Sequence, residues 1–147
     1  MHCKHGLNQR GGNCAATVGQ LAHRVSEVGK DERLLGRWVW VEFKGKMGTT
    51  TRVYVAYRPG RQPAKTSKKT TVYHQHAQYI RSHKLDYDPR SLFDKDLLSE
   101  LTNAMKNSNI ILMLDANEDI EKGSFNDLIL SIGMKNTLYE RVQHPMP

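Results

Sequence analysis

Hydrophobic and polar residues are arranged along the chain in patterns that predict two neighbouring strands early in the sequence. The segment 38–43, Trp-Val-Trp-Val-Glu-Phe, and the segment 51–57 are both rich in aromatic and β-branched residues. This composition is typical of strands. A glycine-containing turn at 45–48 separates the two segments, and Arg-Pro-Gly at 58–60 stops the second one. We therefore predict a β-hairpin with Tyr57 at its carboxyl end.

Apolar residues recur at helical spacing in three later segments, which begin near Val72, Pro89 and Ser124. The second helix follows Asp88, which suits an N-cap with proline at the first helical position. Ser124 is expected to cap the third helix, and Gly133 to end it. The earlier segment 15–28 is ambiguous, because its spacing suits a helix and its first residues suit a strand equally well.

A continuous apolar run, Ile110–Leu114, stands before the polar segment Asp115–Asp119. Such a run predicts a strand buried on both faces, and its carboxyl end is where ligands collect in layered α/β folds. Asp115 and Asn117 are two residues apart and project to the same side in extended backbone. Together they can orient a water, a metal ion or a phosphate oxygen. The alternative is a polar turn in which Asp and Asn serve turn geometry.

Composition places the chain among globular proteins. Its 147 residues suit one domain, with a ragged segment at about 1–10. No apolar run approaches the roughly 20 residues that span a bilayer, so no membrane partner is expected. The start lacks a signal-peptide pattern, and the two cysteines indicate no disulfide scaffold. We therefore expect an intracellular protein, nuclear or cytoplasmic.

The net charge of +7 is unevenly distributed. Basic residues gather in the proline-containing segment after the second strand; they are Arg58, Arg61, Lys65, Lys68 and Lys69. A basic surface attracts polyanions, nucleic acid above all, so these residues are candidates for binding DNA or RNA. Ordinary solubilising charge is the alternative explanation.

The order of these motifs carries a resemblance. Residues 36–43 and 52–59 form a pair of strands, the second ending in Tyr57 just before a proline-containing loop, and Leu114-Asp115-Ala116-Asn117 follows later. This order resembles the middle of the endonuclease/exonuclease/phosphatase superfamily, in which the second motif is Gly-Asp-x-Asn. Residues 72–79 resemble the glutamine-containing helix start of the versions carried by mobile elements and reverse transcriptases. The resemblance covers most of the chain from about Gly11 onward.

The resemblance implies a DNase I-like four-layer α/β sandwich and hydrolysis of a phosphoester assisted by Mg²⁺ or Mn²⁺. It implies that Asp115 orients or deprotonates the attacking water and interacts weakly with the metal, directly or through a water. It implies that Asn117 binds a phosphate oxygen or lies next to the metal. It implies that Tyr57 donates a hydrogen bond to the phosphate or stabilises the leaving group. Hard Mg²⁺ prefers carboxylate and phosphate oxygens, which agrees with these roles.

The sequence also departs from the family pattern. The metal-binding Glu motif and the closing Ser-Asp-His motif of the family are absent, and Leu114 replaces the usual glycine. We therefore expect a partial domain, cut at both ends, with weak or no nuclease activity. Two alternatives stay open, which are a non-catalytic basic module that binds nucleic acid and a phosphatase for another phosphoester. A partner chain or domain that completes the site is a further expectation.

Overall fold

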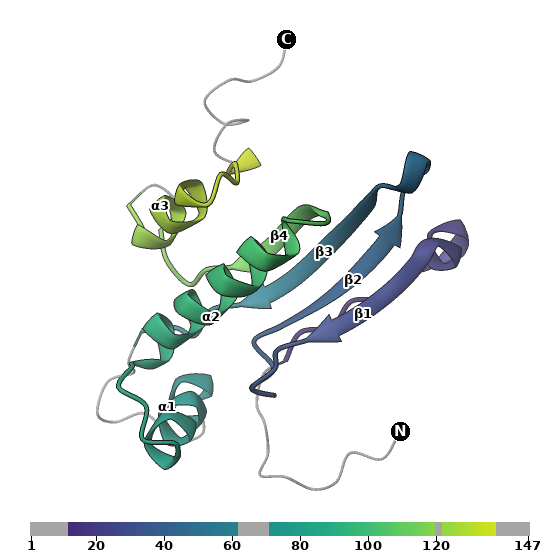
Figure 1. Cartoon of the computed structure of the whole chain (residues 1–147). Helices are drawn as coiled ribbons and strands as arrows, with labels where there is room; N and C mark the ends of the chain where they lie inside the picture. The colour runs from purple at the N-terminus through teal and green to yellow at the C-terminus, as the bar shows by residue number, and fades with distance from the viewer. Residues whose placement is uncertain (1–11, 62–70, 120–121, 138–147) are drawn as a thin grey trace, which may run out of the picture.

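The computed structural model describes residues 12–61, 71–119 and 122–137. Four strands form one mixed sheet in the order β1-β2-β3-β4 (Figure 1). They are β1 (Val25–Lys30), β2 (Trp38–Lys44), β3 (Thr50–Tyr57) and β4 (Asn109–Asp115). The pairs β1–β2 and β2–β3 are antiparallel, whereas β4 runs parallel to β3. The helices are η1 (Gly19–Arg24), η2 (Lys46–Gly48), α1 (Val72–Ser82), α2 (Pro89–Ala104) and α3 (Ser124–Ser131).

The predicted hairpin is confirmed. Its strands β2 and β3 pair without a bulge from Trp38 opposite Ala56 to Lys44 opposite Thr50. The ambiguous segment 15–28 forms the short 3-10 helix η1 at Gly19–Arg24 and the start of β1 at Val25. The strand alternative at its first residues is wrong, because 15–18 form neither helix nor strand.

The three predicted helices are present, and α2 begins as its sequence indicates. The side chain of Asp88 accepts hydrogen bonds from the backbone N–H groups of Arg90 and Ser91, at 2.9 and 3.4 Å. The helix α3 ends before Gly133, which has a φ of +82° that suits a glycine after a helix.

Helices α2 and α3 cover one face of the sheet and enclose the core (Figure 1). The core residues come from both layers and are Trp38, Tyr54, Ala56, Phe93, Leu97, Leu101, Ala104, Phe125 and Ile129. Phe93, Leu97 and Leu101 of α2 are fully buried. Burying each such side chain contributes about 2 kcal/mol, so this helix is the main partner of the sheet.

The opposite face of the sheet carries apolar side chains that the two helices do not reach. Cross-strand partners place Val28, Val41, Val53 and Ile111 in one row on this face. At the ends of the row, Val28 is 66% exposed and Ile111 is 51% exposed. Val41 in the middle of the row is only 7% exposed, so the exposed apolar surface of this face lies at the two ends of the row.

The prediction that Ile110–Leu114 is buried on both faces is wrong. The strand β4 is an edge strand whose residues alternate between exposed and half-buried. Ile111 and Met113, which point away from the helices, are each 51% exposed. An apolar run shows that both faces of a strand are suited to burial, but the covering layers decide whether both are buried.

The structure confirms a mixed α/β fold, with three antiparallel strands, one parallel edge strand and helices on one face. In the described ranges, no helix is both long and apolar enough to cross a bilayer.

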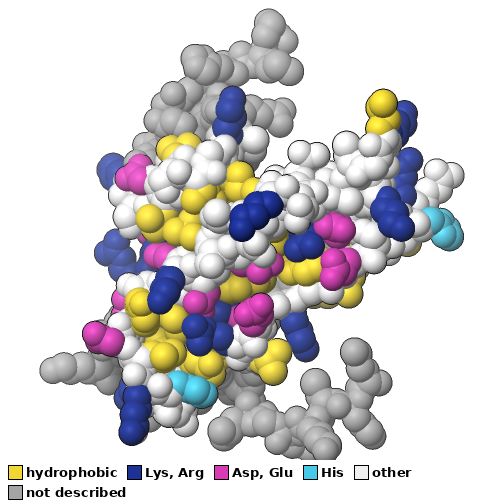
Figure 2. All heavy atoms as spheres, viewed as in Figure 1, with side chains coloured by type: hydrophobic (Ala, Val, Ile, Leu, Met, Phe, Trp, Pro, Cys, Tyr) yellow, Lys and Arg dark blue, Asp and Glu magenta, His cyan; other side chains and the backbone are white. Residues whose placement is uncertain are grey.

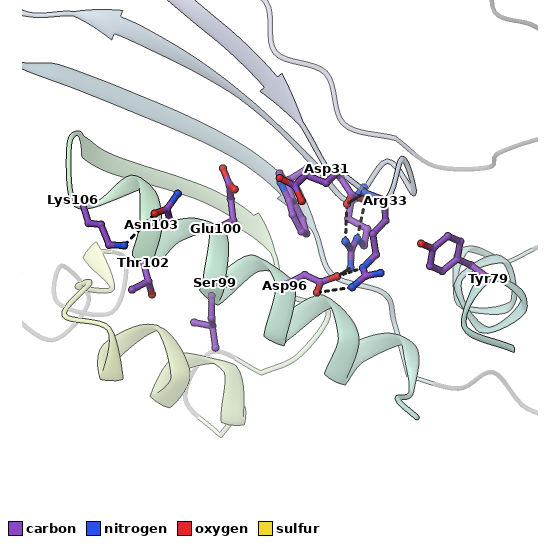
Figure 3. Close-up of a pocket in the computed structure, with 13 residues that line it drawn as sticks. Asp31, Arg33, Tyr79, Asp96, Ser99, Glu100, Thr102, Asn103 and Lys106 are labelled. Atoms are coloured by element: carbon purple, nitrogen blue, oxygen red, sulfur yellow. Dashed lines mark hydrogen bonds and ion pairs between the residues drawn. The ribbon is translucent and has the colours of Figure 1, made fainter. Parts of the chain in front are cut away.

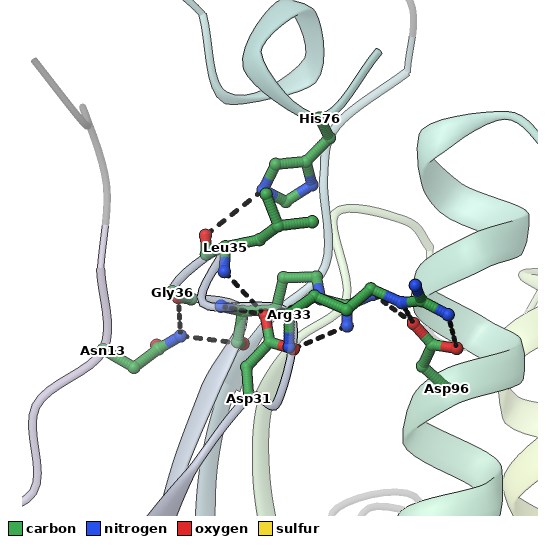
Figure 4. Close-up of polar contacts among 8 residues, drawn as sticks. Asn13, Asp31, Arg33, Leu35, Gly36, His76 and Asp96 are labelled. Atoms are coloured by element: carbon green, nitrogen blue, oxygen red, sulfur yellow. Dashed lines mark hydrogen bonds and ion pairs between the residues drawn. The ribbon is translucent and has the colours of Figure 1, made fainter. Parts of the chain in front are cut away.

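A buried ion-pair network joins the loop after β1 to α2 (Figure 4). Arg37 donates to both carboxylate oxygens of Asp31, at 2.6 and 2.8 Å, and to Asp96 of α2 at 2.9 Å. The side chains of Arg37 and Asp31 are each 1% exposed. Burial acts to raise the pKa of Asp31, but the hydrogen bonds and charge of Arg37 outweigh it and hold that pKa below its usual value.

His76 of α1 packs beside this network. Its Nε2 lies 3.4 Å from the backbone oxygen of Leu35, whereas its Nδ1 is buried without a hydrogen-bond partner. The ring is therefore assigned as neutral, with Nε2–H donating to Leu35. A proton on Nδ1 would have no acceptor, and burial lowers the pKa of His76 to about 4.

His76 makes the fold sensitive to acid. Between its ordinary pKa of 6.5 and its folded pKa of about 4, the unfolded chain binds a proton at His76 and the folded chain does not. The free energy of unfolding should therefore fall by up to about 3 kcal/mol as the pH falls through this window. His76→Gln keeps a donor toward Leu35 and removes the titration. Urea unfolding at pH 7 and pH 4.5 should show a smaller loss for the variant, and equal losses would contradict this account.

Candidate functional site

The structure brings the two predicted strand ends together. Tyr57 and Asp115 are direct partners in the parallel pairing of β3 and β4. The backbone N–H of Arg58 donates to the backbone oxygen of Asp115 at 2.9 Å, one residue beyond Tyr57. Ala56 and Leu114 pack on the helix side, so Tyr57 and Asp115 project from the other face of the sheet. Two residues that are far apart in sequence therefore meet at one edge.

Asn117 holds the loop after β4 against the end of β3. Its backbone N–H donates to Oδ1 of Asp115 at 3.1 Å, which closes an Asx turn. Its side-chain Nδ2 donates to the backbone oxygen of Arg58 at 2.7 Å. Asn117 has a φ of +50°, a conformation that asparagine tolerates better than most residues. The turn alternative raised by the sequence is thus present, and it also fixes the position of Asp115.

Arg58 is buried, which differs from the exposed position that the basic segment suggested. Its guanidinium donates to Asp94 of α2 at 2.7 and 2.5 Å and to Glu118 at 2.5 Å. Its side chain is 3% exposed, and its Cζ lies 4.8 Å from the ring centroid of Phe125. A guanidinium engaged in this way holds the fold together and has no donors directed at a ligand.

Glu118 connects this cluster to α3. It accepts from Arg58, from Arg90 at 2.8 Å and from the backbone N–H of Phe125 at 2.7 Å. The expected Ser124 cap is therefore a wrong prediction, because Gly123 is the N-cap residue and Glu118 accepts from the first turn. Burial acts to raise the pKa of Glu118, but the Phe125 N–H and Arg58 outweigh it and lower that pKa.

The other predicted nucleic-acid contacts are only partly described. Arg61 is exposed directly after the Pro59-Gly60 turn. Lys65, Lys68 and Lys69 lie outside the described residues. On the face shown in Figure 2, Lys and Arg side chains lie among Asp and Glu side chains and form no continuous basic stripe.

The described residues do not form a self-sufficient Mg²⁺ site. Proteins hold Mg²⁺ with one or two carboxylates together with water and substrate phosphates. Asp115 offers one exposed carboxylate at the strand end. Across the described ranges, no cluster of three or more His, Cys, Asp or Glu side chains is placed to hold a metal ion. An ion at Asp115 would need further oxygen ligands from a bound phosphate.

A polar groove of about 850 Å³ lies along α2, apart from these residues (Figure 3). Asp96, Glu100 and Asn103 of α2 line it together with Arg33 and Tyr79. Neither strand-end residue, Tyr57 or Asp115, contributes to its wall. Asp96 in this groove is paired with Arg33 at 2.6 Å and with Arg37 at 2.9 Å.

Comparison of the chain with protein-family models, with curated proteins and with solved structures found no match in any of the three.

The buried position of Arg58 predicts a large effect on stability. Arg58→Ala removes the cation between two carboxylates whose side chains are only 14% and 8% exposed, those of Asp94 and Glu118. The variant leaves Asp94 without its guanidinium and Glu118 with Arg90 as its remaining ion-pair partner, which should lower the free energy of unfolding by about 3 kcal/mol. Arg61→Ala removes an exposed arginine nearby and should change it by less than about 0.5 kcal/mol. Chemical denaturation tests both, and equal effects would show that the cluster does not stabilise the fold.

Proposed function

We propose that the adjoining ends of β3 and β4 form part of a phosphoesterase site that acts on nucleic acid, with weak activity in this chain alone. The observation that carries the proposal is the direct pairing of Tyr57 with Asp115 at the carboxyl ends of two parallel strands. A hydroxyl and a carboxylate on neighbouring strands can hydrogen-bond to one phosphate and to the water that attacks it. This arrangement agrees with the resemblance to the endonuclease/exonuclease/phosphatase superfamily, and a DNase I-like fold is part of the same proposal.

Each residue has a role that its geometry supports. Asp115 is exposed and can accept a proton or a hydrogen bond from a water. The hydroxyl of Tyr57 can donate to a phosphate oxygen. Asn117 acts as a positioning residue, because its amide is directed at the backbone oxygen of Arg58 and its N–H orients the carboxylate of Asp115.

Mg²⁺ or Mn²⁺ belongs to this proposal as an ion that arrives with the substrate phosphate. When bound, it supplies positive charge that stabilises the transition state. The single carboxylate of Asp115 accounts for weak activity, since catalytic groups of this kind act as a unit. A partner chain or domain would supply further ligands, and another phosphoester in place of nucleic acid is the alternative substrate.

Nicking of supercoiled plasmid in the presence of Mg²⁺ or Mn²⁺ tests the site. We expect slow nicking that falls by about tenfold or more in Asp115→Ala, because the general base is lost. Tyr57→Phe, which removes only the hydroxyl, should also reduce the rate. Asp86→Ala removes an exposed carboxylate elsewhere and serves as the control. Equal nicking by the wild type and Asp115→Ala, or none by either, would contradict the proposed catalysis.

A non-catalytic nucleic-acid-binding module is the second candidate, and the ion pairs restrict which basic side chains could serve it. Five described arginines are engaged with carboxylates, namely Arg33, Arg37, Arg52, Arg58 and Arg90. The net charge of +7 is therefore carried by other basic side chains. Arg61 and the lysines of the following segment are the candidates that the sequence singles out.

Binding to a short DNA duplex at increasing salt concentrations tests this candidate. If Lys68 and Lys69 each neutralise one phosphate, Lys68→Ala with Lys69→Ala should reduce the slope of log affinity against log salt by about 2. Lys44→Ala with Lys46→Ala removes the same charge from exposed positions at the end of β2 and the start of η2. This control should leave the slope closer to that of the wild type. Equal slopes for both double variants would exclude the segment as the binding surface.

A further inference from the structure

The outer edge of β4 presents a regular row of backbone hydrogen-bonding groups. The bond from Arg58 N–H to the Asp115 oxygen shows that the backbone groups of Asp115 face β3. The backbone groups of successive residues in a strand point to opposite sides in the plane of the sheet. The backbone groups of Ile111 and Met113 therefore also face β3. The backbone groups of Ile110, Leu112 and Leu114 therefore face outward. No strand pairs with this edge in the described part of the chain.

The two edges of the sheet differ in how they are protected. At the other edge, β1 contains an irregularity between Val25 and Glu27 and carries the charged residues Glu27 and Lys30. Bulges and charges of this kind hinder pairing with another chain. The strand β4 pairs with β3 in an unbroken register, and Ile110–Leu114 contains no charged residue or proline. Among residues 12–61, 71–119 and 122–137, the edge of β4 is therefore the one better suited to pairing with a further strand.

We propose that this edge binds a second copy of the chain through antiparallel pairing of the two β4 strands, with Leu112 on the two-fold axis. Leu112 then pairs with Leu112 of the other copy, and Ile110 pairs with Leu114. In this register all three outward-facing residues of each strand form backbone hydrogen bonds with the other copy. In a register shifted by two residues, only two of them can do so. This inference is independent of the proposed phosphoesterase function.

The side chains of β4 suit this symmetric register. Ile111 lies opposite Met113 of the second copy, and Asn109 lies opposite Asp115. Apolar pairs form along the strand, and an amide meets a carboxylate at each end. A parallel arrangement in register would place the two Asp115 carboxylates side by side, which is unfavourable. The side chains of β4 therefore favour antiparallel pairing with the β4 strand of a second copy over parallel pairing.

The space around β4 is consistent with this occupant. A groove of about 440 Å³ runs beside the strand, between Ile110–Leu112 and the segment from Gly133 to Lys135. On the face away from the helices, Ile111 and Met113 are each 51% exposed. Pairing would bring the apolar face of one sheet into line with that of the other and would reduce this exposure.

Sedimentation equilibrium, combined with amide hydrogen exchange on the whole chain, tests the pairing. Concentrated protein should approach twice the monomer mass of 16.8 kDa and should dissociate on dilution. The amides of Ile110, Leu112 and Leu114 should exchange slowly in the dimer and faster on dilution. A monomer at all concentrations would overturn the proposal, whether its β4 amides exchange quickly or are protected by another part of the same chain.

Paired charge variants test the register. Ile111→Lys with Met113→Lys places like charges directly opposite one another and should raise the dimer dissociation constant by about tenfold or more. Ile111→Lys with Met113→Glu places opposite charges at the same contacts and should restore dimerisation. Both positions are half exposed, so the monomer should keep its fold, which circular dichroism can check.

Val28→Lys separates edge pairing from stacking of two sheet faces. Val28 shares the face of Ile111 but lies on β1, at the opposite edge, and is 66% exposed. This variant should dimerise like the wild type if the β4 edges pair. Loss of the dimer in Val28→Lys, or equal weakening in both variants of Ile111 and Met113, would overturn the proposed contact.

Discussion

The packing of α2 against the sheet is the interaction on which the other features depend. The helix lies on the crossover between β3 and β4, and its buried residues Phe93, Leu97 and Leu101 meet Trp38 and Tyr54 of the sheet. Two consecutive strands can lie side by side and run parallel only if such a crossover connects them. Without α2 packed on this face, the pairing of β4 with β3 would lose its supporting contacts, and Tyr57 would not lie beside Asp115.

Two clusters of ion pairs hold the first half of α2 in place. Asp96 joins the Arg37 network, and Asp94 joins the Arg58 cluster, which also holds Glu118 and the start of α3. Buried pairs of this kind contribute less net stability than apolar packing, but removing one partner is costly. The Arg58 cluster sets the position of the loop after β4 relative to the end of β3, whereas the Arg37 network holds α2 against the loop after β1. Asn117 completes this arrangement through the backbone oxygen of Arg58.

Local signals in the sequence predicted the local structure well. The β2–β3 hairpin and the Asp88 cap depend on neighbouring residues, so patterns over a few positions were sufficient. The burial of Arg58 depends on Asp94 and Glu118, which are 36 and 60 residues away, and no local pattern distinguishes it from an exposed arginine. The exposed face of β4 was missed for a related reason, since apolar composition does not specify what covers a strand. The approach of Tyr57 and Asp115 required the parallel register of their strands, which only the fold supplies.

Paramagnetic broadening by Mn²⁺ in the presence of a short single-stranded DNA oligonucleotide tests the central claim most directly. The claim is that the ends of β3 and β4 form one phosphate-binding edge. In an amide-resolved NMR spectrum, the signals of Tyr57, Arg58, Asp115 and Asn117 should broaden first, while that of Val28 at the opposite edge of the sheet should persist. Asp115→Ala should abolish the selective broadening. Broadening that begins elsewhere, or that is unchanged in the variant, would contradict the account.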